Sequence, residues 1–230
     1  MIGGTPLLLD LFCCQGGASA GYVAAGFDVI GVDIEKQPRY PYEFVWSDAI
    51  SATTALLDGG SLLVNGERYY LSDFAAIHAS PPCQAFTRAQ RLRGNAHPDL
   101  LDVTRFLLRC SGLPYVIENV EGAPLENPLV LCGAMFGLRT YRHRLFESNI
   151  SVSAPHHPPH TAKNAKMGRP AKPDEYMHIV GNFSGVQEGR EAMGIPWMNR
   201  DGLRESIPPA YTEHIGAALL VTITNERNKP

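Results

Sequence analysis

The sequence predicts an α/β fold with parallel strands, and three observations favour this class. The apolar run Leu7–Phe12 is followed by a glycine-rich turn and an alanine-rich stretch, which is the order strand, turn, helix. The apolar run Phe74–Ala79 resembles a buried parallel strand, and it stops just before Pro81 and Pro82, which cannot donate the hydrogen bonds of a strand. The chain has 230 residues, enough for one α/β domain and a small additional lobe.

Composition excludes several other classes of protein. No apolar run approaches the roughly 20 residues that span a bilayer, and the start Met1–Gly4 lacks the charge of a signal peptide. Five cysteines, two of them adjacent, do not suggest a disulfide framework, and no C-x-x-C pair suggests structural zinc. We therefore expect a cytoplasmic protein of a reducing compartment. The net charge of −3 leaves nucleic-acid binding to local basic patches.

The N-terminal block has the pattern of a nucleotide-binding unit. The turn after the first strand contains Gly16, Gly17 and Gly21, and Gly26–Asp33 supplies a helix stop and a second strand. Asp33 ends that strand about 20 residues after the glycines begin, where an acid often binds ribose hydroxyls. The glycines do not form the G-x-G-x-x-G pattern, which weakens the case for a dinucleotide. The block therefore predicts an adenosine-type cofactor, and a glycine-rich turn that binds no ligand is the alternative.

A third strand is predicted at Phe44–Trp46. Asp48 follows it and would face the same crevice as Asp33, although a surface helix cap is an equal alternative. Residues 51–70 are predicted as a helix and a loop with turn signals at 58–60 and 65–66. This stretch indicates no chemistry.

Cys83 follows the two prolines and is therefore placed on a stiff loop at the carboxyl end of a strand. Open α/β sheets bind ligands at that edge, although a cysteine buried in a turn is the plain alternative. Arg88, Arg91 and Arg93 come directly afterwards. They form either a solvated face or a patch that binds phosphates.

A carboxylate stands in the next predicted strand. Residues 98–110 have the spacing of an amphipathic helix, and Tyr115–Val120 is an apolar run that contains Glu118 near its end. Burying an unpaired carboxylate is costly, so Glu118 is either exposed or functional, and we favour the functional interpretation.

Two arginines stand in a further predicted strand. Leu129–Gly133 leads into Tyr141–Glu147, where alternation would place Arg142 and Arg144 on one face. Paired guanidinium groups bind anions such as a phosphate or the carboxylate of Glu118, and a surface strand is the alternative.

Together these segments resemble a known family. Asp10–Gly17, Ser80–Phe86, Glu118–Val120 and the Arg142-x-Arg144 pair are similar, in this order, to the motifs of the S-adenosylmethionine-dependent DNA cytosine-5 methyltransferases. The resemblance covers roughly residues 7–148 and resumes at 208–216. It implies a class I methyltransferase fold, a Rossmann-like, mostly parallel seven-stranded sheet with one antiparallel strand and helices on both faces. It also implies three parts: a catalytic, cofactor-binding domain at 1–148, a small target recognition region at 149–207, and a returning C-terminal helix at 208–230.

The resemblance implies a mechanism as well. The thiolate of Cys83 would add to C6 of a flipped-out cytosine, and Glu118 would donate a proton toward N3. Arg144, together with Arg142, would orient Glu118 and the O2 atom of the base. Two alternatives remain: a tRNA cytosine-5 methyltransferase, or a catalytically idle DNA-binding relative.

The cofactor implied is S-adenosylmethionine, which leaves as S-adenosylhomocysteine. The turn after the first strand would hold its methionine part, and the ends of the second and third strands would hold its adenosine. The cofactor-binding residues expected are Phe12, Cys13, Gln15, Gly16, Gly17, Asp33, Ile34, Asp48, Ala49 and Pro82. The sequence departs from the family pattern at three positions, which are Ile34 in place of an aromatic residue, Thr140 in place of Gln, and Ala217 in place of Asn.

The partner implied is double-stranded DNA, bound by a monomeric, compact protein of prokaryotic or phage type. The DNA-binding residues expected are Gln84, Arg88, Arg91, Arg93, Lys163, Lys166 and Arg169. His156–His160 resembles a metal clip, but adjacent histidines separated by prolines lack the usual spacing of zinc ligands. We therefore expect a surface loop there, and neither a metal nor a membrane as a partner.

Three local structures are predicted for the C-terminal part. His178–Phe183 would form a strand and a turn, and Asp201 would cap a short helix that runs to Ser206. Ile215–Ile223 would form the closing helix.

Overall fold

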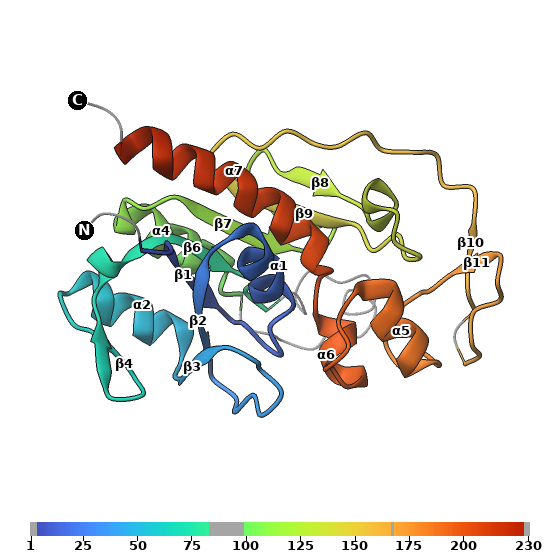
Figure 1. The fold of residues 1–230 in the computed structure, drawn as a ribbon, viewed down its shortest axis with the longest axis horizontal. Coiled ribbons are helices and arrows are strands. Elements are labelled where there is room, and N and C mark those ends of the chain that lie inside the picture. Colours follow the sequence, from blue (N-terminus) through green and yellow to red (C-terminus); the bar gives the residue numbers. More distant parts are fainter. Residues whose placement is uncertain (1–3, 83–98, 167, 228–230) are drawn as a thin grey trace.

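A seven-stranded sheet forms the centre of the protein (Figure 1). The computed structural model describes residues 4–82, 99–166 and 168–227. The strand order is β3-β2-β1-β6-β7-β9-β8, and β9 is antiparallel to both of its neighbours while the other pairs are parallel. The strands are β1 (Leu7–Leu11), β2 (Asp28–Asp33), β3 (Glu43–Trp46), β6 (Phe74–Ala79), β7 (Tyr115–Asn119), β8 (Leu129–Leu131) and β9 (Arg144–Ser148). The predicted sheet, with its single antiparallel strand, is confirmed.

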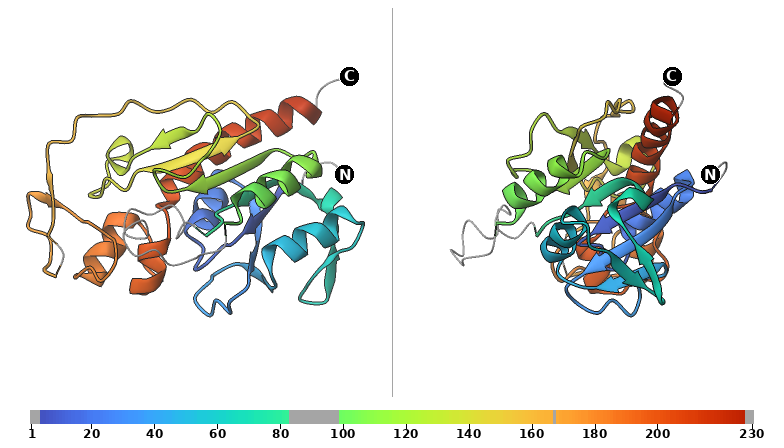
Figure 2. Two further views of the ribbon diagram at one scale, coloured as in Figure 1. Left: turned by 180° about the vertical axis from the view of Figure 1, so that it is seen from behind. Right: turned by 90° about the vertical axis from the view of Figure 1, so that its left-hand side faces the viewer.

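Helices cover both faces of this sheet (Figure 2). One face packs against α1 (Gly17–Ala25) and α7 (Pro209–Arg227), and the other against α2 (Ala49–Leu57) and α4 (Leu101–Ser111). Successive side chains of a strand point to opposite faces, so Leu8 joins the α1 and α7 cluster and its neighbour Leu9 joins the other. Among the described residues, α7 included, no helix is long and apolar enough to cross a membrane.

The remaining elements are short. A hairpin of β4 (Leu62–Val64) and β5 (Glu67–Tyr69) turns at Asn65 and Gly66, which both have positive φ as a tight two-residue turn requires. The turn signal at 65–66 is present in the sequence, but the sequence predicted a loop there and not a hairpin. The others are η1 (Leu71–Asp73), η3 (Gly133–Phe136), β10 (Lys163–Asn164), β11 (Glu175–Tyr176), α5 (Val186–Met193) and α6 (Arg200–Glu205). A third apolar cluster, drawn from residues 177–203, packs around α5 and α6.

Four predicted boundaries were wrong. The strand expected at 141–147 begins only at Arg144, because the backbone at Arg142 has a φ of 32°. Residues 178–183 form no strand, and β11 ends just before them. The cap of α6 is Asn199, whose Oδ1 accepts from the N–H of Gly202 at 2.9 Å, and not Asp201. The closing helix starts at Pro209, six residues before Ile215, because proline suits the first turn of a helix.

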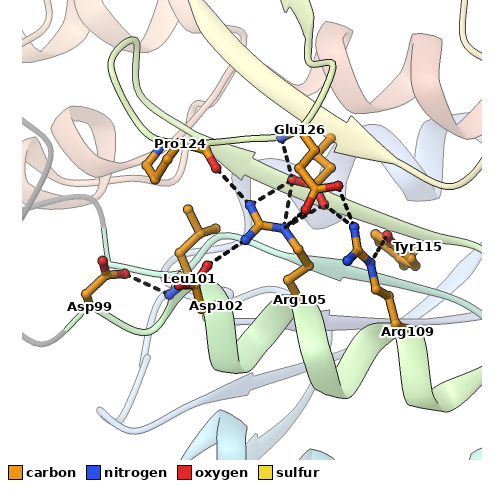
Figure 3. Close-up of polar contacts among 9 residues, drawn as sticks. Asp99, Leu101, Asp102, Arg105, Arg109, Tyr115, Pro124 and Glu126 are labelled. Atoms are coloured by element: carbon orange, nitrogen blue, oxygen red, sulfur yellow. Dashed lines mark hydrogen bonds and ion pairs between the residues drawn. The ribbon is translucent and has the colours of Figure 1, made fainter.

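A buried ion pair joins α4 to β9 (Figure 3). Arg105 Nε lies 2.9 Å from Oε1 of Glu147, and the two side chains are only 9% and 3% exposed. The same guanidinium donates to Asp102 Oδ1 at 2.7 Å and to the carbonyl of Pro124 at 2.9 Å. The N–H of Glu126 donates to Glu147 Oε2 at 2.8 Å. Because both side chains are almost fully buried, removal of Arg105 would leave the carboxylate of Glu147 in the interior with only the more distant Arg109, at 3.8 Å, as a cation.

We expect Arg105→Met to lower the free energy of unfolding by about 3–5 kcal/mol, because it leaves the carboxylate of Glu147 buried without its cation. Arg109→Met is the matched control. Arg109 is half-exposed and pairs with Glu126 at 2.7 Å and more distantly with Glu147 at 3.8 Å, so solvent screens its charge and its loss should cost much less than that of Arg105. Urea unfolding of both variants measures the two values, and equal losses would contradict this assignment.

Candidate active site

The site lies at the carboxyl edge of the sheet, where the ends of β1, β6 and β7 meet the segment before α7. A small cavity opens there between the turn after β1, Ser80, Glu118 and residues 205–207. From the N-terminal part of the chain, the residues that line this cavity are Asp10, Phe12, Cys13, Cys14, Gly17 and Ala18. The structure thus brings the predicted cofactor turn and the predicted catalytic acid to one cavity.

The turn after β1 has an unusual backbone. Phe12, Cys14 and Gly16 have φ values of 60°, 47° and 84°, so the chain reverses within a few residues and enters α1 at Gly17. A Cβ at Gly17 would lie 1.7 Å from Ser206 Oγ, so only glycine fits between the turn and the segment before α7. The N-terminus of α1 therefore approaches the cavity closely, and its free N–H groups favour a negatively charged ligand group.

No role was predicted for Asp10 from the sequence. Its carboxyl is completely buried under the turn and accepts a hydrogen bond from Ser19, and burial raises its pKa to about 7. Its Oδ1 atom has no hydrogen-bond partner within the described ranges. A buried acceptor beside a cavity needs a donor, and a ligand in the cavity could supply one.

Asp33 is held in place at the end of β2. Its Oδ2 accepts from the N–H of Cys14 and its Oδ1 from the N–H of Glu35, both at 2.9 Å. Each carboxylate oxygen can accept a second bond, which leaves room for hydroxyl donors. The neighbouring Ile34 is 65% exposed, so it offers an uncovered apolar surface next to this carboxylate.

Asp48 is the N-cap of α2. Its Oδ1 accepts from the N–H of Ser51 at 2.8 Å, and the next residue, Ala49, is the buried first residue of the helix. The helix cap, which was the alternative prediction for Asp48, is therefore present. The N–H and the hydroxyl of Ser51 both donate to Oδ1 of Asp48, so the helix cap uses only one of the two carboxylate oxygens.

Gln15 connects the turn to the small lobe, which is the third apolar cluster around α5 and α6. Its Nε2 donates to Asn199 Oδ1 at 2.9 Å, and its backbone carbonyl accepts from Trp197 Nε1 at 2.7 Å. The side chain of this predicted cofactor residue thus fixes the turn against residues 197–199. Pro82, which was also assigned to the cofactor, is partly exposed at the end of the described segment.

Glu118 is buried at the end of β7, as the functional interpretation required. Arg144 Nε lies 2.9 Å from its Oε1, but no described residue donates a directed hydrogen bond to that atom. Burial raises the pKa of Glu118, and the charge of Arg144 and a hydrogen bond from Ser80 oppose this shift only in part. The carboxyl can therefore carry a proton at a higher pH than an exposed glutamate can.

Arg142 and Arg144 differ in what they contact, although the pattern predicted one common face. The guanidinium of Arg142 donates to the carbonyls of Ile179, Arg204 and Ser206 at 2.6–2.7 Å. Its charge still acts on Glu118, but more weakly than that of Arg144. Arg142 thus joins three backbone segments around the site, while Arg144 forms the direct ion pair.

Asn119 is a second residue that the sequence reading did not assign. Its Nδ2 donates to the carbonyl of Pro81 at 3.1 Å, and its own Oδ1 accepts from the N–H of Val120. The side chain therefore fixes the chain two residues before Cys83. Its position beside Glu118 in the Glu-Asn-Val motif was the available signal.

Several predicted residues lie outside the described part of the chain: Cys83, Gln84, Arg88, Arg91 and Arg93. Of the second basic patch, Lys163 and Lys166 are exposed. Arg169 pairs with Glu175 at 2.6 Å. That pairing neutralises part of the positive charge expected for this patch.

His78 lies fully buried on β6, directly under the site. Its Nδ1 is 2.9 Å from the Tyr22 hydroxyl and its Nε2 is 2.9 Å from Ser80 Oγ. Burial lowers the pKa of His78 to about 3, so the ring stays neutral and bridges the core to Ser80.

Comparison with known proteins supports the fold at low sequence identity. No protein-family model matches the sequence, and no curated protein matches it. A prophage-encoded protein of E. coli, assigned as a DNA modification methyltransferase, aligns over 96% of this chain and 100% of its own, with 15% identity and a TM-score of 0.62. The Dnmt2 methyltransferase of S. pombe aligns over 97% of this chain and 99% of its own, with 14% identity and a TM-score of 0.55. The chain therefore has the predicted methyltransferase fold.

We expect His78→Gln to make the protein less sensitive to acid. The unfolded chain binds a proton on His78 near pH 6.5, whereas the folded chain does so only near pH 3. Relative to the variant, the wild type should lose up to about 1.4 kcal/mol of unfolding free energy per pH unit as the pH falls between those values. Urea unfolding of both proteins from pH 8 to pH 4 measures this difference. A difference that stays constant with pH would contradict the assignment.

Proposed function

We propose that this protein transfers a methyl group from S-adenosylmethionine to C5 of cytosine in DNA. The observation that carries the proposal is the buried pair of Glu118 and Arg144. It lies across one cavity from the turn after β1, and Ser80, three residues before Cys83, lines the same cavity. Addition to a pyrimidine ring requires an acid with a raised pKa, a guanidinium and a thiolate, and Cys83 comes three residues after Ser80 in the sequence.

The described residues fit the proposed cofactor. The unpartnered Oδ1 of Asp10 and the N-terminus of α1 would hold the ammonium and the carboxylate of its methionine part, respectively. Asp33 would accept from the ribose hydroxyls, Ile34 would cover the adenine, and Asp48 would accept from the adenine amino group. When bound, the cofactor supplies an electrophilic methyl group on a sulfonium.

The chain's own residues would make C5 nucleophilic. The thiolate of Cys83 forms a bond to C6, and the electron pair of the C5–C6 double bond moves toward C5 and N3. Glu118 gives its proton to N3, while Arg144 holds the carboxyl and balances the charge that is left. After C5 has gained the methyl group, a base removes the C5 proton and the bond to Cys83 breaks.

Double-stranded DNA is the proposed substrate. Both faces of the ring must be reached, one by the thiolate and the other by the methyl donor, so the cytosine must leave the helix stack. Residues 149–207 contain the third apolar cluster and the exposed Lys163 and Lys166, and we assign target recognition to this region. A lobe of this size suits a short target and a monomeric enzyme.

Trapping on modified DNA tests the proposal. Fluorine at C5 cannot leave as a proton does, so DNA with 5-fluorocytosine should remain bonded to Cys83 after methyl transfer. We expect a complex that survives denaturation on a gel and that requires S-adenosylmethionine. Cys83→Ala should abolish it, and Cys110→Ala, which alters an exposed cysteine, should not. A complex that persists in Cys83→Ala would sink the proposal.

Two further substrates separate the rival interpretations. Methyl transfer to tRNA with none to duplex DNA would identify a tRNA cytosine-5 methyltransferase. DNA binding without methyl transfer to either nucleic acid would identify an idle relative. Either result would contradict the proposed function.

We expect Glu118→Gln to lower kcat by about 10²–10⁴-fold, because the amide cannot donate a proton to N3. Since the protonated carboxyl is the active form, wild-type activity should fall as the pH rises through the raised pKa of Glu118. The variant should lack this decline. Glu121→Gln, an exposed carboxylate three residues later, is the control and should keep both the rate and the pH profile of the wild type. Methyl transfer measured across pH checks both expectations.

A further inference from the structure

A cluster of four potential metal ligands lies outside the proposed active site. Cys132 follows β8, His143 precedes β9, and His157 and His160 belong to the segment between β9 and β10. One ligand atom from each side chain, the thiol sulfur or a ring nitrogen, lies within 4.8 Å of all the others. Three separate parts of the chain therefore bring four ligand atoms of the types that zinc prefers to one point.

The distances suit a tetrahedral ion. With bonds of about 2.3 Å to sulfur and about 2.0–2.1 Å to nitrogen, tetrahedral zinc keeps its ligand atoms roughly 3.3–3.6 Å apart. Cys132 Sγ lies 3.4 Å from His160 Nε2, within that range. The widest pair needs to approach by only about 1 Å, which the rotation of an exposed histidine ring can supply.

Neighbouring groups orient the ligands. The ring of Tyr141 stacks on His160 with centroids 3.7 Å apart, and its hydroxyl donates to the carbonyl of Ala162 at 2.8 Å. The ring of His143 lies 5.0 Å from that of His160 and 5.7 Å from that of His157. These ring contacts hold the imidazoles of His143, His157 and His160 close together, as a shared metal ion requires. Stacking of the rings does not by itself explain why the thiol of Cys132 lies within 4.8 Å of a ring nitrogen of each histidine.

We propose that Cys132, His143, His157 and His160 bind one zinc ion. One thiolate and three imidazoles favour zinc over magnesium or calcium, which prefer oxygen ligands. Four protein ligands complete the tetrahedron and leave no position for a substrate, so the ion is structural.

The site would fix a long segment that has little other support. Residues 151–161 are neither helix nor strand, and they cross the molecule as an extended strap (Figures 1 and 2). One hydrogen bond ties this strap to α7, between His214 Nε2 and the carbonyl of Ser153 at 2.8 Å. Because the four ligands come together only in the folded chain, zinc bound at His157 and His160 would stabilise the folded position of the strap beside β8 and the start of β9.

The proposal departs from the expectation of a plain surface loop in His156–His160. The spacing within that run could not reveal a site, because Cys132 and His143 come from other parts of the sequence. The proposal does not depend on the methyl-transfer reaction.

Metal analysis of the untagged protein tests it, since a histidine tag would itself bind zinc. After purification without chelators, elemental mass spectrometry should find one zinc per chain. Cys132→Ala and His160→Ala should retain at most a small fraction of it. His156→Ala is the matched control, because this exposed histidine adjoins His157 but is not part of the cluster, and its zinc content should equal that of the wild type.

Cobalt substitution of the wild type keeps the test decisive if the variants fold poorly. Cobalt bound in this site should show the intense visible bands of a tetrahedral complex and a thiolate-to-cobalt charge-transfer band in the near ultraviolet. Cys132→Ser should lose the charge-transfer band. The proposal is overturned if wild type reconstituted with zinc or cobalt binds no metal, if the cobalt complex lacks the charge-transfer band, or if Cys132→Ala binds zinc as the wild type does.

Discussion

The antiparallel pairing of β7 with β9 is the constraint on which the site depends. Residues 116–119 pair with residues 145–148, which brings the start of β9 beside the end of β7. Glu118 and Arg144 therefore meet at one edge of the sheet although they are far apart in the sequence. Burial favours the protonated carboxyl and Arg144 favours the ionised one, and burial is the larger effect. The strand pairing thus places beside Glu118 the cation that opposes the effect of burial on its pKa.

Most of the fold could be predicted because each central strand is a short apolar run bounded by turn residues. Leu7–Leu11 and Phe74–Ala79 are buried on both faces, so all their residues except Asp10 and His78 are apolar and the strands are easy to recognise. The predicted boundaries of helices and strands were wrong where a local sequence pattern competes with tertiary contacts. Arg142 has the alternation of a strand residue, yet its side chain bonds to three carbonyls and its backbone has a positive φ, so β9 begins only at Arg144.

The candidate site was predictable where a residue type signals its own chemistry. A carboxylate in an apolar strand and a glycine-rich turn carry such signals. Asn119 does not, because its effect on the chain before Cys83 depends on the carbonyl of Pro81, which only the fold brings near. The proposed zinc ligands carry no such signal either, because only the pairing of β8 with β9 brings Cys132, which follows β8, near His143, which precedes β9.

The small lobe and Glu118 are connected through one short stretch of chain. Arg142 bonds to carbonyls at 179, 204 and 206, His143 belongs to the proposed zinc site, and Arg144 pairs with Glu118. Three consecutive residues thus contact the lobe, the strap and the acid. The strand start that places Arg144 beside Glu118 is therefore also held by the carbonyls at 179, 204 and 206.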